Sequence, residues 1–110
     1  MTETTERREG EECPPPPTLA GAHARDMRIV NRKGLHARAT AKFVQCVDRF
    51  DAQVKVTRCG ETVGGDSIMG ILTLGAEVGS TITVTALGAQ AVEALDALEA
   101  LVANRFDEDE

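Results

Sequence analysis

The chain has 110 residues and a formal net charge of −6, and its aromatic residues are three Phe, with neither Trp nor Tyr. This length fits one domain that can bury a core of its own. The negative charge and the lack of stacking aromatic side chains argue against nucleic acid as a partner.

The three cysteines, Cys13, Cys46 and Cys59, are an odd number without a C-x-x-C pair. They predict reduced thiols in a cytoplasmic protein and neither a disulfide framework nor a zinc site. No apolar run is long enough to span a bilayer, so we expect no membrane insertion.

The two ends of the chain differ in composition from the middle. Residues 1–26 are acidic and contain four consecutive prolines, which predicts a disordered leader. Residues 27–106 carry the periodic apolar patterns of a folded domain. The acidic residues 107–110 follow a helix C-terminus, where carboxylates are mildly unfavourable, and predict a frayed tail.

Alternating and helical apolar spacing places the elements within this domain. In chain order they are a strand at 27–30, a helix at 37–50, strands at 53–57 and 61–63, a short helix at 68–74, a strand at 81–86 and a helix at 92–102. Cys59 and Gly60 are typical of a two-residue hairpin turn. The order βαββαβα predicts an α+β open-faced sandwich, in which a four-stranded antiparallel sheet carries three helices on one face.

The first helix begins at a histidine that has the parts of a phosphoryl carrier. The neutral imidazole of His36 is a nucleophile near neutral pH. The unpaired N–H groups of a helix start bind phosphate, and Arg38 adds a permanently charged donor. From this pentapeptide alone, an N-cap histidine without chemistry is the favoured interpretation.

Two further features belong to the same part of the chain. Ser67 is a good N-cap for the short helix, and the apolar Ile68 and Met69 follow it as candidates for partner docking or for the core. Basic residues cluster in sequence around His36, which favours phosphate or an acidic protein surface; they are Arg28, Arg32, Lys33, Arg38 and Lys42.

With these motifs in place, residues 27–106 resemble the HPr family, the histidine phosphocarriers of the bacterial phosphoenolpyruvate-dependent phosphotransferase system. The resemblance rests on GLHAR at 34–38, on GDSIMG at 65–70 and on the element order. It implies that Nδ1 of His36 accepts a phosphoryl group from phosphorylated enzyme I and passes it to an EIIA-type acceptor. It implies that Arg38 helps to hold the phosphate. The backbone N–H groups of Ala37 and Arg38 can also donate hydrogen bonds to it. Such a protein is a carrier that needs partner enzymes, not an enzyme, and the resemblance implies no cofactor and no metal.

The resemblance also implies that an HPr kinase phosphorylates Ser67. It leaves the sugar branch and the nitrogen-type branch of the system open, and we expect a monomer. Ala39 stands where the family often has Pro, and we expect this departure to tune the site without abolishing it. The alternative is a regulatory module of the same fold that binds partners without a covalent step.

Overall fold

The computed structural model describes residues 21–108. Its strands are β1 (His23–Arg28), β2 (Gln53–Arg58), β3 (Glu61–Gly64) and β4 (Thr81–Leu87), and its helices are α2 (Ala37–Val47), α3 (Ile68–Thr73), α4 (Ala91–Ala103) and the short 3₁₀ helix η1 (Arg105–Asp107). The predicted α+β open-faced sandwich with the order βαββαβα is confirmed.

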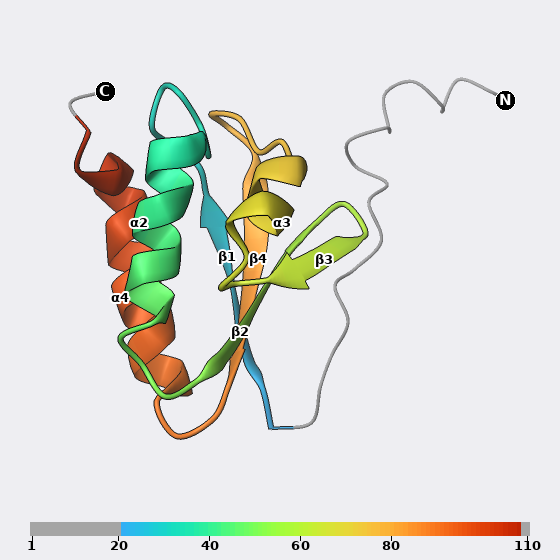
Figure 1. Cartoon of the computed structure of the whole chain (residues 1–110), viewed down its shortest axis with the longest axis vertical. Helices are drawn as coiled ribbons and strands as arrows, with labels where there is room; N and C mark the ends of the chain where they lie inside the picture. Colours follow the sequence, from blue (N-terminus) through green and yellow to red (C-terminus); the bar gives the residue numbers. More distant parts are fainter. Residues whose placement is uncertain (1–20, 109–110) are drawn as a thin grey trace, which may run out of the picture.

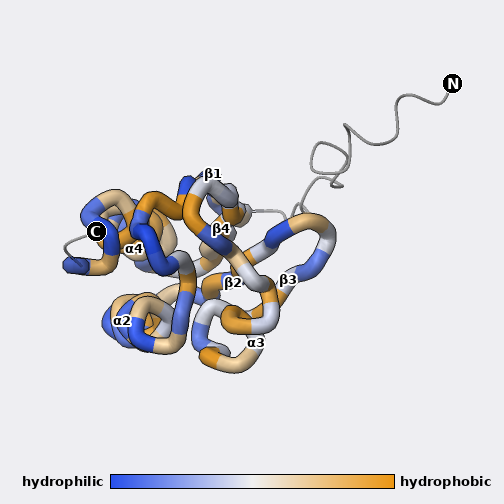
Figure 2. Tube along the Cα trace, turned by 90° about the horizontal axis from the view of Figure 1, so that it is seen from above, coloured by the Kyte–Doolittle hydropathy of each residue, from blue (hydrophilic) through white to orange (hydrophobic). Residues whose placement is uncertain are grey.

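The sheet is antiparallel throughout and has the strand order β1-β4-β2-β3. Val56 of β2 lies opposite Val63 of β3 on one side and opposite Val84 of β4 on the other. The three α-helices cover one face of this sheet (Figures 1 and 2).

The core lies between the sheet and the helices. Alternate residues of the central strands point into it, such as Ile82, Val84 and Ala86, each with 0% of its surface exposed. Phe43 of α2 and Leu98 of α4 meet them from the helical layer, also at 0% exposure. Burying a Val, Ile, Leu or Phe side chain supplies about 1.5–3 kcal/mol. Such residues therefore recur on the buried face of each element, and their period-2 and helical spacing predicted the elements well.

The predicted start of the domain, near Met27, is wrong for the first strand. β1 begins at His23 and ends at Arg28, and its residues pair with β4 from Ala86 to Thr81. Only Met27 of this edge strand is buried, so the other five residues show no apolar alternation. Of the predicted leader at 1–26, residues 23–26 therefore belong to the sheet, and residues 1–20 lie outside the described part.

The prediction of reduced cysteines is wrong for Cys59, which is disulfide-bonded. Cys59 and Gly60 form the expected turn between β2 and β3, both with positive φ, of 47° and 86°. Cys59 is exposed in this turn, so the thiol of another cysteine can reach it. The number of cysteines in the sequence does not show which of them are accessible in this way. Cys46 is free and buried, and Cys13 lies outside the described residues. The cysteines therefore do not support the expected reducing compartment.

The start of α2, the end of α4 and the short helix α3 lie at the same end of the molecule (Figure 1). α2 packs against both other helices, and η1 follows α4 directly. None of the helices within residues 21–108 has the length and apolar character needed to cross a membrane. The shared end brings together the segments that carry the predicted site residues.

Candidate functional site

His36 is the N-cap of α2, as predicted, and a tight loop before it sets its position. The Leu35 N–H donates to the Ala76 carbonyl at 2.9 Å, and the His36 N–H donates to the Gly34 carbonyl at 2.9 Å. Thr40 N–H then donates to the His36 carbonyl at 2.8 Å, which is the first hydrogen bond of the helix. The extended backbone of His36, with φ −82° and ψ −177°, turns its side chain back over the first turn.

Both ring nitrogens of His36 have partners. Nδ1 accepts a hydrogen bond from the Arg38 N–H at 3.2 Å. Nε2 lies 2.5 Å from a carboxylate oxygen of Glu108, which is 72 positions further along the chain. The side chain of His36 remains 27% exposed, so its ring is held on two sides and still reachable from solvent.

Glu108 contradicts the prediction of a frayed tail at residues 107 and 108, while residues 109 and 110 lie outside the described part of the chain. Its other carboxylate oxygen accepts from the Asn31 side chain at 3.1 Å, and only 15% of its side-chain surface is exposed. Asp107 accepts from the side chain of Asn104 at 2.7 Å. The acidic composition of the tail suggested that its side chains are solvated. Instead, Asn31 and His36 at the start of α2 and Asn104 at the end of α4 hold residues 107 and 108 in place.

The charge of Glu108 follows from these contacts. Burial alone would raise the pKa of this carboxyl. The hydrogen bonds from His36 and Asn31, together with the electrostatic influence of His36 and Lys33, outweigh burial and place the pKa below its usual value. Glu108 is therefore an ionised hydrogen-bond acceptor at neutral pH.

The structure places Ala37 and Arg38 in the exposed first turn of α2. Of the two predicted phosphate-binding N–H groups, that of Arg38 already faces Nδ1. Ala39 is fully buried at 0% exposure, within the first turn, where helices tolerate proline.

Ser67 is the N-cap of α3, and its hydroxyl accepts from the Gly70 N–H at 3.0 Å. The next two side chains both face solvent, Ile68 at 42% and Met69 at 70% exposure. The core interpretation therefore fails for both, and Ile71 is the buried residue of this helix instead. Because α3 packs against α2, these apolar side chains belong to the same end of the molecule as His36.

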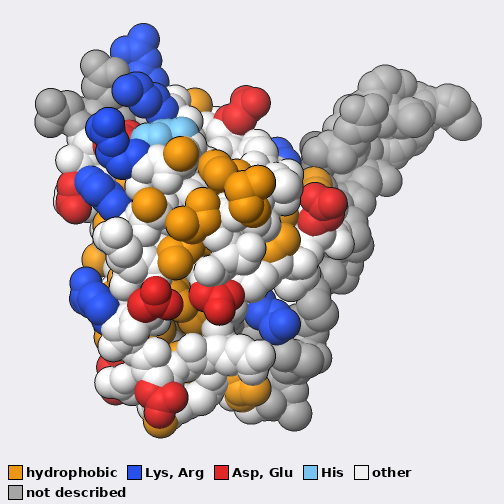
Figure 3. Space-filling model, in the orientation of Figure 1, with side chains coloured by type: hydrophobic (Ala, Val, Ile, Leu, Met, Phe, Trp, Pro, Cys, Tyr) orange, Lys and Arg blue, Asp and Glu red, His pale blue; other side chains and the backbone are white. Residues whose placement is uncertain are grey.

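The surface view shows how these groups are arranged (Figure 3). A histidine side chain lies near the upper end of this face, with Lys and Arg side chains on one side and a patch of hydrophobic side chains on the other. This combination can attract an acidic protein and then bury apolar surface against it.

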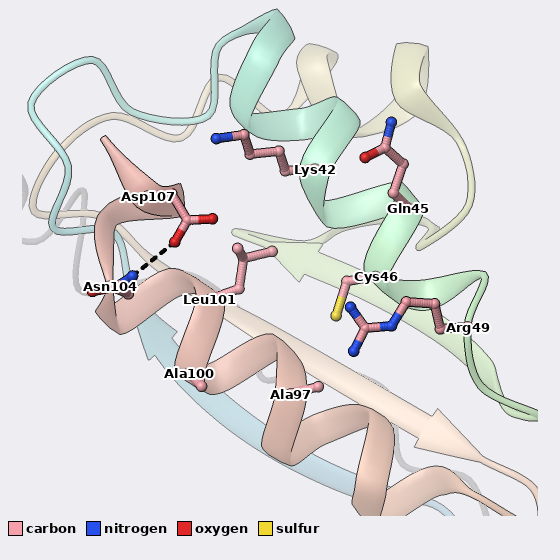
Figure 4. Close-up of a pocket in the computed structure, with 9 residues that line it drawn as sticks. All are labelled: Lys42, Gln45, Cys46, Arg49, Ala97, Ala100, Leu101, Asn104 and Asp107. Carbon is pink, nitrogen blue, oxygen red and sulfur yellow. Dashed lines mark hydrogen bonds between the residues drawn. The ribbon is translucent and has the colours of Figure 1, made fainter. Parts of the chain in front are cut away.

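A groove of about 620 Å³ lies elsewhere, between α2 and α4 (Figure 4). It is lined by Lys42, Gln45, Cys46, Arg49, Ala97, Ala100, Leu101, Asn104 and Asp107. Burial raises the pKa of the Cys46 thiol, although the charge of Arg49 opposes this, so the thiol is a poor nucleophile. Within residues 21–108, no three His, Cys, Asp or Glu side chains gather closely enough to hold a metal ion.

Sequence reasoning missed the contacts of three residues that shape the site. Glu108 contacts both Asn31 and His36, and the Lys42 ammonium donates to the Phe106 carbonyl at 2.8 Å. Lys42 was expected only as part of a basic cluster. Nothing local marks Asn31 or Glu108, because each acts through a contact with a distant part of the chain.

Fold and site together define a small open-faced sandwich protein with a partly exposed histidine at a helix start. Residues 23–104 match the family model described as the PTS HPr component phosphorylation site. The phosphocarrier protein HPr of Cupriavidus necator is 51% identical over 86 residues, which cover 78% of this chain and 97% of that protein.

Solved structures agree with this result. HPr-C-His from Thermoanaerobacter tengcongensis has a TM-score of 0.77 and 36% identity, and the match covers 80% of this chain and 99% of that one. The phosphocarrier protein HPr of Bacillus anthracis has a TM-score of 0.71 and 42% identity, covering 74% and 96%. The chain belongs to the HPr family of the phosphotransferase system, and it is a phosphocarrier protein rather than an enzyme.

Proposed function

We propose that His36 is the residue that carries the phosphoryl group, on Nδ1. Phosphorylated enzyme I is the donor and an EIIA-type protein is the acceptor. The observation that supports this most is the position of the ring: His36 caps α2, directs Nδ1 to the Arg38 N–H and keeps 27% of its side chain exposed. An exposed ring lets donor and acceptor proteins reach the same atom in turn.

The helix start supplies the electrostatics for this transfer. A phosphoryl group on Nδ1 would meet the first-turn N–H groups of Ala37 and Arg38, which carry the positive end of the helix dipole. The guanidinium of Arg38 adds a planar donor for the phosphate oxygens. These groups favour the bound phosphoryl without taking part in covalent chemistry.

The surface beside His36 suits the partner proteins. Ile68 and Met69 offer exposed apolar area next to basic side chains, and we assign both to docking. Phosphorylation of Ser67 by an HPr kinase would place negative charge at the start of α3, beside this docking surface. It would also change the hydroxyl that now accepts from the Gly70 N–H. A cytoplasmic location belongs to the same proposal, and the acceptor protein decides between the sugar and nitrogen branches.

Phosphate transfer from labelled phosphoenolpyruvate, with catalytic amounts of enzyme I, tests the proposal. We expect acid-labile label on the wild type and none on His36→Ala. His23→Ala is the matched control, because the chain has two histidines and His23 is exposed on β1. It should be labelled like the wild type.

Two results would contradict the proposal. Label on His36→Ala would move the site elsewhere, and an unlabelled wild type would favour a regulatory module that acts without a covalent step. In the same assay, a Ser67→Asp protein should accept phosphate more slowly than the wild type. An equal rate would remove Ser67 from the proposal.

A further inference from the structure

We propose that Glu108 is a positioning residue for His36. Its carboxylate accepts the ring proton on Nε2 and thereby leaves the lone pair of the imidazole on Nδ1. This inference rests on the proposed function of His36 and adds a second group to that site.

The two neighbours of the ring independently require the same tautomer. The carboxylate of Glu108 can only accept, so Nε2, at 2.5 Å, must carry the proton. The backbone N–H of Arg38 can only donate, so Nδ1, at 3.2 Å, must present its lone pair. Together they fix both the protonation and the orientation of the ring.

Asn31 holds the carboxylate from the other side. Its side chain is fully buried, and Nδ2 donates to the Gly34 carbonyl at 2.8 Å and to Glu108 at 3.1 Å. Its Oδ1 is buried and has no partner among the described residues. The amide is therefore oriented by its two acceptors, and it links Glu108 to the loop that precedes His36.

The backbone that delivers Glu108 is held equally firmly. Arg105, Phe106 and Asp107 all have positive φ, from 54° to 65°, which turns the chain back toward the start of α2. Phe106 is fully buried, and its carbonyl accepts from Lys42 of α2 at 2.8 Å. A strained backbone persists only where the surrounding contacts hold it in place. Here those contacts anchor Phe106, two residues before Glu108.

This arrangement matches the needs of the transfer step. The Nδ1 lone pair forms the new N–P bond while the bond from phosphorus to the donor breaks, and its electron pair leaves with the donor. No proton has to leave His36, because Nε2 keeps its own. The ring gains positive charge as the bond forms, and the carboxylate of Glu108 lies beside it to stabilise that charge.

NMR of the ring, combined with the phosphate-transfer rate, tests this inference on the full chain. In the wild type we expect a downfield Nε2–H signal from His36 that exchanges slowly with water. Glu108→Ala should lose that signal and accept phosphate from enzyme I about tenfold more slowly, which is close to the lower limit expected for a hydrogen bond to a charged group. Glu108→Gln keeps an acceptor oxygen and should fall between the two.

Asp107→Asn is the matched control. It removes one negative charge next to Glu108, Asn tolerates positive φ, and its amide oxygen can still accept from Asn104. We expect a wild-type signal and rate. An unchanged rate in Glu108→Ala, or a slower rate with the Nε2–H signal retained, would overturn the inference. An unlabelled wild type would instead refute the carrier role of His36, and the NMR signal alone would then decide whether Glu108 positions the ring.

Discussion

Gly34 gives the loop before His36 a shape that other residues cannot take. Its φ of +70° lies in the left-handed region, and a Cβ at this position would lie 2.7 Å from the Ala76 carbonyl oxygen. That same oxygen accepts the hydrogen bond from Leu35. The residue is therefore required both for its backbone angle and for the close approach of residue 76.

Gly34→Ala should lower the free energy of unfolding by more than about 2 kcal/mol, because left-handed strain and the clash add together. Gly75→Ala is the control, since its φ is +64° and nothing lies within 4 Å of the added Cβ. It should cost only the strain, about 1 kcal/mol. Urea denaturation of both variants measures the difference in the free energy of unfolding. Equal decreases in the two variants would show that the backbone at Ala76 moves away from the added Cβ at no energetic cost.

At the level of single residues, the sequence predicts what is local. His36 as a helix N-cap and Ser67 as the next one follow from residues within one turn of each, and both are confirmed. Glu108 lies 72 positions from His36, and its segment is anchored beside the site by the buried Phe106 and by contacts to Lys42 and Asn31. No spacing rule could pair these residues.

η1 and the residue after it act as a clasp between α4 and α2, defined here as residues 105–108. Its contacts to α2 and the loop before it come from Lys42, His36 and Asn31. His36 and Lys33 are the two groups whose electrostatic influence lowers the pKa of the Glu108 carboxyl. The contacts that Glu108 makes within the clasp therefore depend on its ionisation.

Acidification should weaken the contacts of Glu108 with His36 and Asn31. The folded-state pKa of Glu108 lies below its ordinary value, so its contribution to stability is complete above the ordinary value and is lost as the pH falls through the lowered one. Carbon-13 NMR of the Glu108 carboxyl measures this titration. In His36→Ala the pKa should rise toward the ordinary value, and an identical titration in both proteins would contradict the assigned cause.

Among the elements, the buried ones are predictable and the edge is not. β4 shows clean alternation because both its neighbours and the helical layer bury its alternate residues, and its predicted range of 81–86 differs from the observed one by a single residue. Among residues 21–108, β1 pairs along one side only, and Arg25 and Asp26 within it use polar partners, Glu99 and Thr83. An edge strand of this kind leaves no apolar period to detect.

For the whole molecule, the sign of the charge varies over the surface although the net charge is −6. Lys33 and Arg38 are exposed next to His36, and Lys and Arg side chains lie on one side of a histidine in Figure 3. A basic area on an acidic protein orients an approaching acidic partner before contact.

Association with enzyme I should therefore depend on salt. Between about 0.05 M and 0.5 M salt we expect the association rate constant to fall about tenfold, because screening shortens the range of this attraction. Lys33→Gln should reduce both the rate and its salt dependence, whereas Lys55→Gln, on β2, should change neither. Stopped-flow mixing gives these rates, and a rate independent of salt would exclude electrostatic steering.

The strand order also bears on how the chain matures during synthesis. In the described part of the chain, β4 is the last strand to be made, yet it lies between β1 and β2 and is the only strand there that pairs with β1. Until residues 81–87 have left the ribosome, a nascent chain can form only the β2–β3 hairpin and its local helices. The sheet then closes in one late, long-range step, so an interrupted translation product lacks a folded core.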